Sequence, residues 1–317
     1  MPKISTFSLL ESPNWSDYAL LDSGDGLKME RFGSYIFVRP EVQAMWSRAL
    51  PEKEWAKAHA VFQPTSEESG GYWRFKKKVA EKWEMRYPLD LTPGPLASPK
   101  GAPKRRGELK FWAMTTSGRH LGVFPECATH WDWSVDLIDK AKRPIKVLNL
   151  FGYTGLATLA AAAAGAQVTH VDASKKSVTW ARDNQALSGL TEKPIRWIVD
   201  DALKFVQREA RRGNKYDGIL LDPPKFGRGP KGEVWEIYKS LPKLLEACRQ
   251  VLSDRPLFVI TTVYAVQASA LHVGQALGEL LHDFRGSVES GELVTREQSA
   301  ERLLSQAVYA RWSSGDE

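Results

Sequence analysis

The stretch Lys146-Val-Leu-Asn-Leu-Phe-Gly-Tyr-Thr-Gly155 decides how this chain folds. Its apolar start and its two glycines predict a strand that turns sharply into a helix. A second predicted strand ends at Asp172, and a later one ends in Asp222-Pro-Pro-Lys-Phe226. Strands that end in a glycine turn and in acids predict a nucleotide-shaped ligand lying across the carboxyl ends of a parallel sheet.

The chain after Thr129 alternates between strand-like and helix-like patterns. Strands are predicted at 147–150, 167–171, 195–199, 218–221 and 257–262, and helices at 133–142, 155–164, 174–188, 202–212, 234–252 and 267–281. Near-continuous apolar strands separated by helices predict an α/β fold with a parallel sheet covered on both faces. The runs 286–297 and 306–312 predict a closing antiparallel hairpin.

The first part of the chain has a different pattern. Short apolar runs punctuated by Gly, Pro and Asp predict strands at 18–21, 26–32, 34–39, 57–62, 71–75, 82–87, 110–116 and 120–124. The segment 93–106 is rich in Pro and Gly, which predicts a loop. Since 317 residues are many for one core, we expect two domains. Residues 1–125 are predicted to form a small antiparallel β-barrel or sandwich, and 126–317 the α/β domain.

Positive charge is concentrated in one segment. The chain has a net charge of +6, yet residues 71–120 alone contain twelve Lys and Arg against four acids. Between Tyr72 and Tyr87 the basic residues alternate with aromatic ones, as in surfaces that bind single-stranded nucleic acid. The alternative is a hairpin with its aromatics in the core and its lysines in water. As a whole the segment favours a polyanion such as RNA.

Composition excludes several classes of protein. Cys127 and Cys248 are the only cysteines, which excludes a disulfide framework and suits a reducing cytosol. No Cys/His cluster has metal-ligand spacing, so we expect no metal. The longest apolar run, 156–166, is too short to span a bilayer, and the first residues lack a signal-peptide pattern. We expect a cytoplasmic protein, and either a monomer or a homodimer.

The predicted turn after the first strand suits a bound nucleoside. Gly152 and Gly155 allow the backbone to approach a ligand at the start of a helix, although the full three-glycine dinucleotide fingerprint is absent. Asp172 ends the next strand at the spacing of a ribose-binding acid, with helix capping as the alternative role. These features in register favour a cofactor site.

Further polar residues follow the next elements. Asp201 is predicted near an adenine ring, with the Ala202 N–H as donor; Asp200 competes for this role, and capping is the alternative for either Asp. Asn184 either supports the glycine turn or is a packing residue.

The segments 147–155, 172–174, 201–202 and 222–226 resemble, in order and spacing, class I S-adenosylmethionine-dependent methyltransferases. The likeness is greatest to the bacterial large-subunit ribosomal RNA group that methylates cytosine C5 and guanine. It covers 122–265 well and implies a Rossmann-like domain with a mostly parallel seven-stranded sheet. Gly122-Val-Phe-Pro-Glu126 resembles the segment that enters the family's cofactor site. The predicted S-adenosyl-L-methionine contacts are Phe124, Glu126, Asn149, Phe151, Gly152, Tyr153, Thr154, Gly155, Asp172, Ala173, Ser174, Asn184, Asp201, Ala202 and Asp222.

The predicted reaction site is Asp222, Pro223, Pro224, Lys225 and Phe226. Two prolines stiffen the turn, so that the Asp carboxylate faces the cleft from a fixed position. In the family's amine-methylating members a similar turn carries its aromatic residue directly after the second Pro. Here Lys225 lies between the second Pro and Phe226. The sequence therefore leaves open whether the methyl group is transferred to an amine. Phe226 is predicted to stack on a base, and Lys225 to bind a phosphate or to be solvated.

The sequence favours a non-covalent reaction. Relatives that methylate cytosine C5 carry a cysteine after the next strand, where this chain has Thr261-Thr-Val-Tyr264. Cys248 is predicted to be core and Cys127 to be misplaced for this role, whereas His130 is a candidate for lining the cleft. We therefore predict methylation of an RNA base, with ribosomal RNA favoured. The alternatives are a protein or small-molecule substrate and a non-catalytic cofactor-binding module.

Overall fold

The fold was analysed in a computed structural model that describes residues 4–12, 15–65, 70–91, 105–264 and 267–315. Most of the predicted loop 93–106, with Lys100 and Lys104, lies outside the described residues. The side chains of Arg105 and Arg106 are not described either.

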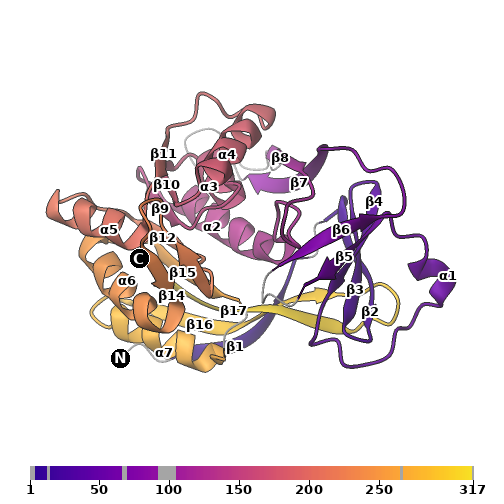
Figure 1. Ribbon diagram of the computed structural model, residues 1–317. Coiled ribbons are helices and arrows are strands. Elements are labelled where there is room, and N and C mark those ends of the chain that lie inside the picture. The colour runs from indigo at the N-terminus through magenta and orange to yellow at the C-terminus, as the bar shows by residue number, and fades with distance from the viewer. Residues whose placement is uncertain (1–3, 13–14, 66–69, 92–104, 265–266, 316–317) are drawn as a thin grey trace.

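The molecule is built on an eight-stranded sheet with the order β1-β16-β17-β15-β12-β9-β10-β11 (Figure 1). Its parallel centre comprises β9 (Lys146–Leu150), β10 (Gln167–Asp172), β11 (Ile195–Val199), β12 (Gly218–Leu221) and β15 (Phe258–Val263). The hairpin of β16 (Gly286–Arg296) and β17 (Leu303–Ser314) joins antiparallel to β15. This arrangement confirms the predicted Rossmann-like fold and closing hairpin.

The eighth strand was not predicted. β1 (Ile4–Glu11) pairs in parallel with β16 and covers an edge that would otherwise present unpaired backbone groups. The two backbones approach closely, because a Cβ at Gly291 would lie 1.7 Å from the carbonyl oxygen of Ser8. Residues 4–11 therefore belong to the large sheet, although the predicted boundary at residue 125 assigned them to the β-rich part.

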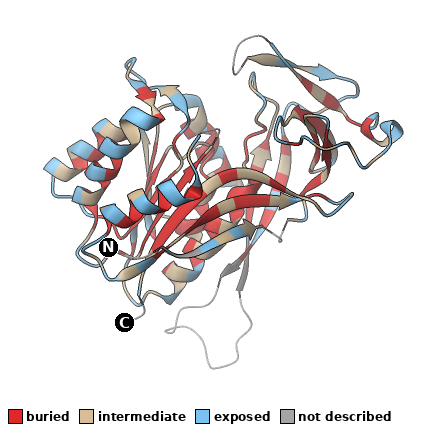
Figure 2. Ribbon diagram, turned by 90° about the horizontal axis from the view of Figure 1, so that it is seen from below, coloured by how far each residue is buried: buried red, intermediate tan, exposed pale blue. Residues whose placement is uncertain are grey.

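Helices cover both faces of this sheet (Figure 1). One layer contains α2 (Ala128–Lys140), α3 (Leu156–Ala163) and α4 (Lys175–Leu187); the other contains α5 (Ala202–Arg211), α6 (Ile237–Val251) and α7 (Ala270–Leu280). The central strands are apolar along their length because both of their faces are buried, as the red strands of Figure 2 show. The predicted helix 234–252 begins later, at Ile237, because 234–236 form β14.

A second sheet has five strands in the order β2-β3-β4-β5-β6. They are β2 (Tyr18–Gly24), β3 (Leu27–Phe32), β4 (Tyr35–Pro40), β5 (Ala60–Pro64) and β6 (Gly71–Phe75). All neighbours are antiparallel except β4 and β5, which run parallel because the connection between them, with the short helix α1 (Glu52–Trp55), crosses over. The predicted strand 120–124 is irregular and leads into a 3₁₀ turn at Pro125–Cys127.

The separate hairpin of β7 (Trp83–Leu91) and β8 (Arg105–Ala113) packs against α2, α3 and α4. Trp83 and Tyr87 are buried there, whereas Lys82 and Arg86 are exposed. On β7, therefore, the aromatics face the core and the basic residues face water. On β6 the outcome differs, because Tyr72 and Phe75 are themselves exposed.

Candidate cofactor and active site

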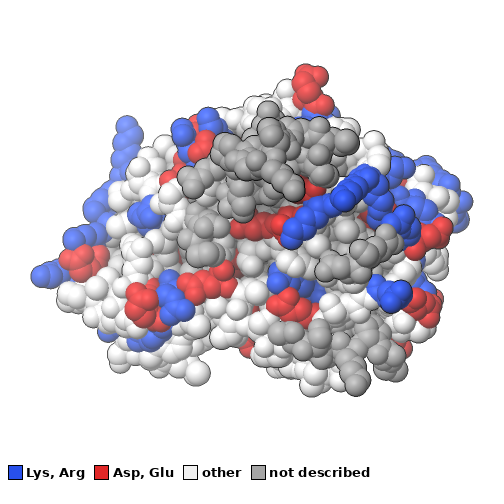
Figure 3. Space-filling view, turned by 180° about the vertical axis from the view of Figure 1, so that it is seen from behind, with Lys and Arg blue, Asp and Glu red and all other residues white. Residues whose placement is uncertain are grey.

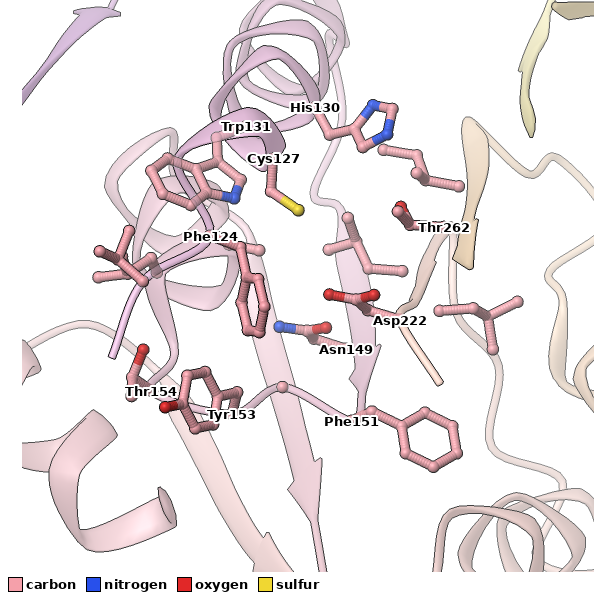
Figure 4. A pocket seen from close by; sticks show the side chains of 17 residues that line it. Phe124, Cys127, His130, Trp131, Asn149, Phe151, Tyr153, Thr154, Asp222 and Thr262 are labelled. Atoms are coloured by element: carbon pink, nitrogen blue, oxygen red, sulfur yellow. The ribbon is translucent and has the colours of Figure 1, made fainter. Parts of the chain in front are cut away.

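A pocket with an empty volume of about 550 Å³ opens at the carboxyl ends of β9 and β12 (Figure 4). Its walls come from the segment before α2, from α2 itself, from the glycine turn and from the ends of β12 and β15. The lining residues are Val123, Phe124, Cys127, His130, Trp131, Asn149, Phe151, Gly152, Tyr153, Thr154, Leu156, Ala157, Leu220, Leu221, Asp222, Ile260 and Thr262.

The turn from Phe151 to Gly155 has positive φ angles, which residues with a side chain rarely adopt. Phe151 has φ 59°, Tyr153 φ 48° and Gly155 φ 85°. For the non-glycine residues Phe151 and Tyr153 this conformation costs about 1–3 kcal/mol each, and such residues cluster at functional sites, whereas Gly155 adopts it freely. A Cβ at Gly152 would lie 2.3 Å from the His170 ring, so no other residue fits there without displacing the ring. The sequence thus fixes a strained, closely approaching loop at the pocket.

Asp172 holds this loop from the end of β10. Its two carboxylate oxygens accept hydrogen bonds from the backbone N–H groups of Tyr153 (2.9 Å) and Ser174 (2.8 Å). Burial raises the pKa of Asp172. Ser174 in turn caps α4 by accepting from Ser177 N at 3.1 Å. Asp172 therefore does not cap the helix but ties the glycine turn to the next strand.

A buried chain of polar groups supports the pocket floor. The Asn149 amide donates to Thr158 Oγ1 at 2.9 Å, and that hydroxyl lies 2.9 Å from His170 Nδ1. Burial lowers the pKa of His170 to about 3, so the ring is neutral at physiological pH. These contacts fix Asn149, which borders the pocket beside Asp222.

Asn184 is a buried support of the loop. Its amide donates to the Thr154 carbonyl at 2.9 Å, and its oxygen accepts from Trp112 N at 2.9 Å. Thr154 also donates to the carbonyl of Gly122 at 2.6 Å. Asn184 thus connects the glycine turn to β8 without lining the pocket.

Asp222 is the most unusual group of the site. It follows β12 and is partly buried, and its Oδ1 is buried with no hydrogen-bond partner among the described residues. Burial, followed by the nearby negative charge of Glu126, raises the pKa of Asp222 well above its usual value. A buried carboxyl oxygen without a partner is costly and indicates a ligand that supplies one.

The rest of the Asp-Pro-Pro turn points away from the pocket. The Pro224 carbonyl accepts from Trp235 Nε1 at 2.6 Å, and the Lys225 carbonyl accepts from Ile237 N at 3.1 Å. Phe226 begins a short strand and is 58% exposed. Pro223 to Phe226 therefore border the site rather than line it.

Several predicted contacts lie outside the pocket lining. Asp201 Oδ1 caps α5 by accepting from Lys204 N at 2.9 Å, which leaves its second oxygen available, and Ala202 is buried. Asp200 pairs with Arg208. Glu126 is buried beside a second cavity, at the junction with the smaller sheet. Gly155, Asp172, Ala173, Ser174 and Asn184 are not among the lining residues either.

Several pocket residues had no predicted role or only a minor one. Cys127, His130 and Trp131 lie three and four residues apart, so they share one face at the start of α2; this spacing is the signal that could have grouped them. Thr262, at the end of β15, completes this wall. Neither ring nitrogen of His130 has a hydrogen-bond partner among the described residues, and burial lowers its pKa to about 3.

The comparisons with known proteins decide the family. The family model described as S-adenosylmethionine-dependent methyltransferase matches residues 115–272. The crystal structure of the SAM-dependent methyltransferase from Agrobacterium tumefaciens is 44% identical, covers 99% of this chain and 97% of its own, and superimposes with a TM-score of 0.87. This chain belongs to the S-adenosylmethionine-dependent methyltransferases.

More distant relatives support narrower conclusions about this chain. The ribosomal RNA large subunit methyltransferase K/L of Shewanella frigidimarina is 37% identical over 117 residues, which is 36% of this methyltransferase but only 16% of that relative. A Streptococcus mutans methyltransferase is 17% identical with a TM-score of 0.66, covers 94% of this chain and 76% of its own, and supports the fold alone.

S-adenosylmethionine is the cofactor of this family, and the residues at the pocket fit it. The close approach at Gly152, the buried carboxyl oxygen of Asp222 and the aromatic rings of Phe124, Phe151 and Tyr153 suit a nucleoside with polar substituents. In the described part of the chain, no group of three His, Cys, Asp or Glu side chains is placed to hold a metal ion. No described helix has the length and apolarity to cross a bilayer.

Proposed function

We propose that this methyltransferase modifies a base in RNA, with ribosomal RNA as the favoured substrate. The observation that carries the proposal is the unpartnered Oδ1 of Asp222, held in the same pocket as the strained glycine turn. This juxtaposition places a hydrogen-bonding group for the methyl-accepting substrate beside a site for a nucleoside cofactor.

For the cofactor, we assign the adenosine part to the turn from Phe151 to Gly155, with Asn149 and Phe124 as further walls. Asp172 and Ala173 would meet the ribose, and Asp201 and Ala202 the adenine. Ser174 and Asn184 hold these groups in place through the bonds to Ser177 and Thr154. When bound, S-adenosylmethionine supplies a methyl group on a sulfonium that leaves readily.

Asp222 positions the substrate that accepts the methyl group. Its raised pKa favours the neutral carboxyl, whose Oδ1 accepts a hydrogen bond from the substrate. The following prolines, and the bond from Trp235 to Pro224, hold the turn rigid. Because methyl transfer is an in-line displacement, positioning of this kind supplies much of the rate.

A covalent cysteine route is not part of the proposal. A thiolate is the nucleophilic form of cysteine, and burial, followed by the charges of Asp222 and Glu126, raises the pKa of Cys127 well above its usual value. The pocket cysteine therefore stays protonated.

Surface charge supports RNA over smaller substrates. Tyr72, Arg74, Phe75, Lys76 and Lys78 are all exposed on β6 and just after it. No described carboxylate pairs with Arg74, Lys76 or Lys78. Lys and Arg also gather toward both ends of the face seen in Figure 3. Exposed aromatics among unpaired cations suit unstacked bases and phosphates. Ribosomal RNA places the proposed activity in the cytoplasm.

The test uses the purified protein and tritiated methyl groups of S-adenosylmethionine. RNA from a strain that lacks this gene should accept label that ribonuclease releases. Label in a cell extract that resists ribonuclease would instead indicate a protein or small molecule. Cofactor binding without label in any fraction would indicate a non-catalytic cofactor-binding module.

A further inference from the structure

A small hairpin lies directly beside the proposed reaction site. β13 (Phe226–Arg228) and β14 (Val234–Glu236) pair antiparallel, with Phe226 opposite Glu236 and Arg228 opposite Val234. β13 begins four residues after Asp222, so the hairpin continues the turn that borders the pocket. We propose that its outer face binds the single-stranded RNA that flanks the target base; this inference rests on the proposed RNA substrate.

The inner face fixes the hairpin to the site. Trp235 is buried, and its ring lies 4.8 Å from that of Phe151, which lines the pocket. Its Nε1 donates to the Pro224 carbonyl at 2.6 Å. The hairpin and the Asp-Pro-Pro turn therefore form one supported unit.

The outer face of the hairpin exposes apolar surface. Side chains alternate across a strand, so Phe226 and Arg228 lie on the face opposite Gly227. Phe226 is 58% exposed and Val234 61%. Tyr238, on the first turn of α6, is 55% exposed. Apolar groups gathered in this way, beside an active site, indicate a binding surface.

The charges around this face suit a polyanion. Glu233 pairs with Lys204 at 2.7 Å and Glu236 with Lys239 at 2.5 Å, which neutralises both acids of the hairpin. Arg228 is exposed, and no described carboxylate pairs with it. One cation beside an aromatic ring can meet one phosphate and one base.

The position of Asp222 inside the pocket explains why the bound RNA must be single-stranded. A base inside a duplex is out of reach of a buried carboxyl, so the target nucleotide must leave its stack or already be unpaired. The nucleotide next to the target then needs a surface on which its base can stack. Phe226 offers that surface at the rim, which is a different role from stacking the target base itself.

The experiment measures binding of a fluorescein-labelled twelve-nucleotide uridine RNA to the intact protein by anisotropy. Phe226→Ala should weaken the affinity by about tenfold. Arg228→Gln should lower the slope of log affinity against log salt by about 0.7. The matched controls are Met45→Ala, an exposed apolar residue of the smaller sheet's connection, and Lys53→Gln in α1; both should bind as the wild type does.

Binding of S-adenosylhomocysteine checks that each variant keeps its pocket, because Trp235 and Phe151 are untouched. Wild-type affinity in both hairpin variants would overturn the inference and leave the proposed function standing. If these variants keep RNA affinity but dissociate a wild-type dimer in sedimentation, the surface belongs to a second copy and the inference is wrong. If the wild type neither binds nor methylates RNA, the proposed function fails and the inference with it.

Discussion

Cys127 Sγ lies 2.8 Å from the hydroxyl oxygen of Tyr264. The two residues come from different parts of the chain: Cys127 ends the 3₁₀ turn before α2, and Tyr264 follows β15. The Tyr264 ring also lies 5.3 Å from that of Phe124 in the pocket wall. Tyr264 therefore stands near the position where cytosine-C5 enzymes of the resembled group carry their nucleophile, and here it is paired to a buried thiol.

The first prediction concerns this pair. Cys127→Ala should keep methyl transfer within about tenfold of the wild type, because the thiol serves as a hydrogen-bonding and packing group. Loss of a covalent nucleophile would instead cost roughly 10⁴-fold or more. Single-turnover transfer of labelled methyl distinguishes the two, and a trapped protein–RNA adduct in the wild type would contradict our account. Cys248→Ala, in the core of α6, is the control for general loss of packing.

The second prediction follows from the buried carboxyl of Asp222. Its folded-state pKa is raised, so the neutral form is favoured in the fold and the stability contribution is lost as pH rises from the unfolded pKa through the folded one. Asp222→Asn should therefore raise the melting temperature at pH 7 relative to the wild type and have little effect near pH 3. The amide keeps an oxygen that accepts a hydrogen bond, so methyl transfer should fall less in Asp222→Asn than in Asp222→Ala. An equal effect at both pH values would contradict the burial argument.

Much of the catalytic fold could be predicted because its strands are buried on both faces. Continuous apolar runs such as 257–260 have few alternatives, and the acid or glycine at the carboxyl end of several strands marks the ligand edge. β1 could not be predicted in this way. Its pairing with β16 depends on contacts between residues more than 280 positions apart, and a run such as Ile4-Ser-Thr-Phe7 shows no apolar periodicity.

The candidate site was predictable in its loops and less so in its walls. Phe151, Tyr153 and Asp222 were found because they follow strands. Cys127 and His130 were set aside or left open, because a helix face contributes to a pocket only through its packing angle, which local sequence does not encode. Glu126 was expected at the cofactor, but the turn at Pro125 directs it to the junction between the sheets.

The third prediction tests the proposed cofactor loop. Asp172→Ala removes the hydrogen bonds to Tyr153 N and Ser174 N and should lower S-adenosylhomocysteine affinity by about 100-fold, since the glycine turn loses its tie to the end of β10. Isothermal titration calorimetry measures this effect. Asp183→Ala, an exposed carboxylate on the same layer, should bind normally. Unchanged affinity in Asp172→Ala would remove this acid from the site.

The fourth prediction concerns the close approach at Gly152. Gly152→Ala places a methyl group 2.3 Å from the His170 ring and should both destabilise the protein and abolish the thermal shift caused by S-adenosylhomocysteine. Gly118→Ala is the matched control, since the nearest atom to its added methyl group is 3.8 Å away. A normal shift in Gly152→Ala would mean that the loop tolerates a side chain and does not need to approach its ligand.

Nucleoside mass spectrometry of total RNA from a strain lacking this gene, complemented either with the wild type or with Asp222→Ala, tests the proposed methylation most directly. We predict that one methylated nucleoside disappears in the deletion strain, returns with the wild-type gene and stays absent with the variant, which lacks the accepting carboxyl oxygen. An unchanged set of methylated nucleosides in the deletion strain, or full recovery with Asp222→Ala, would contradict the proposal.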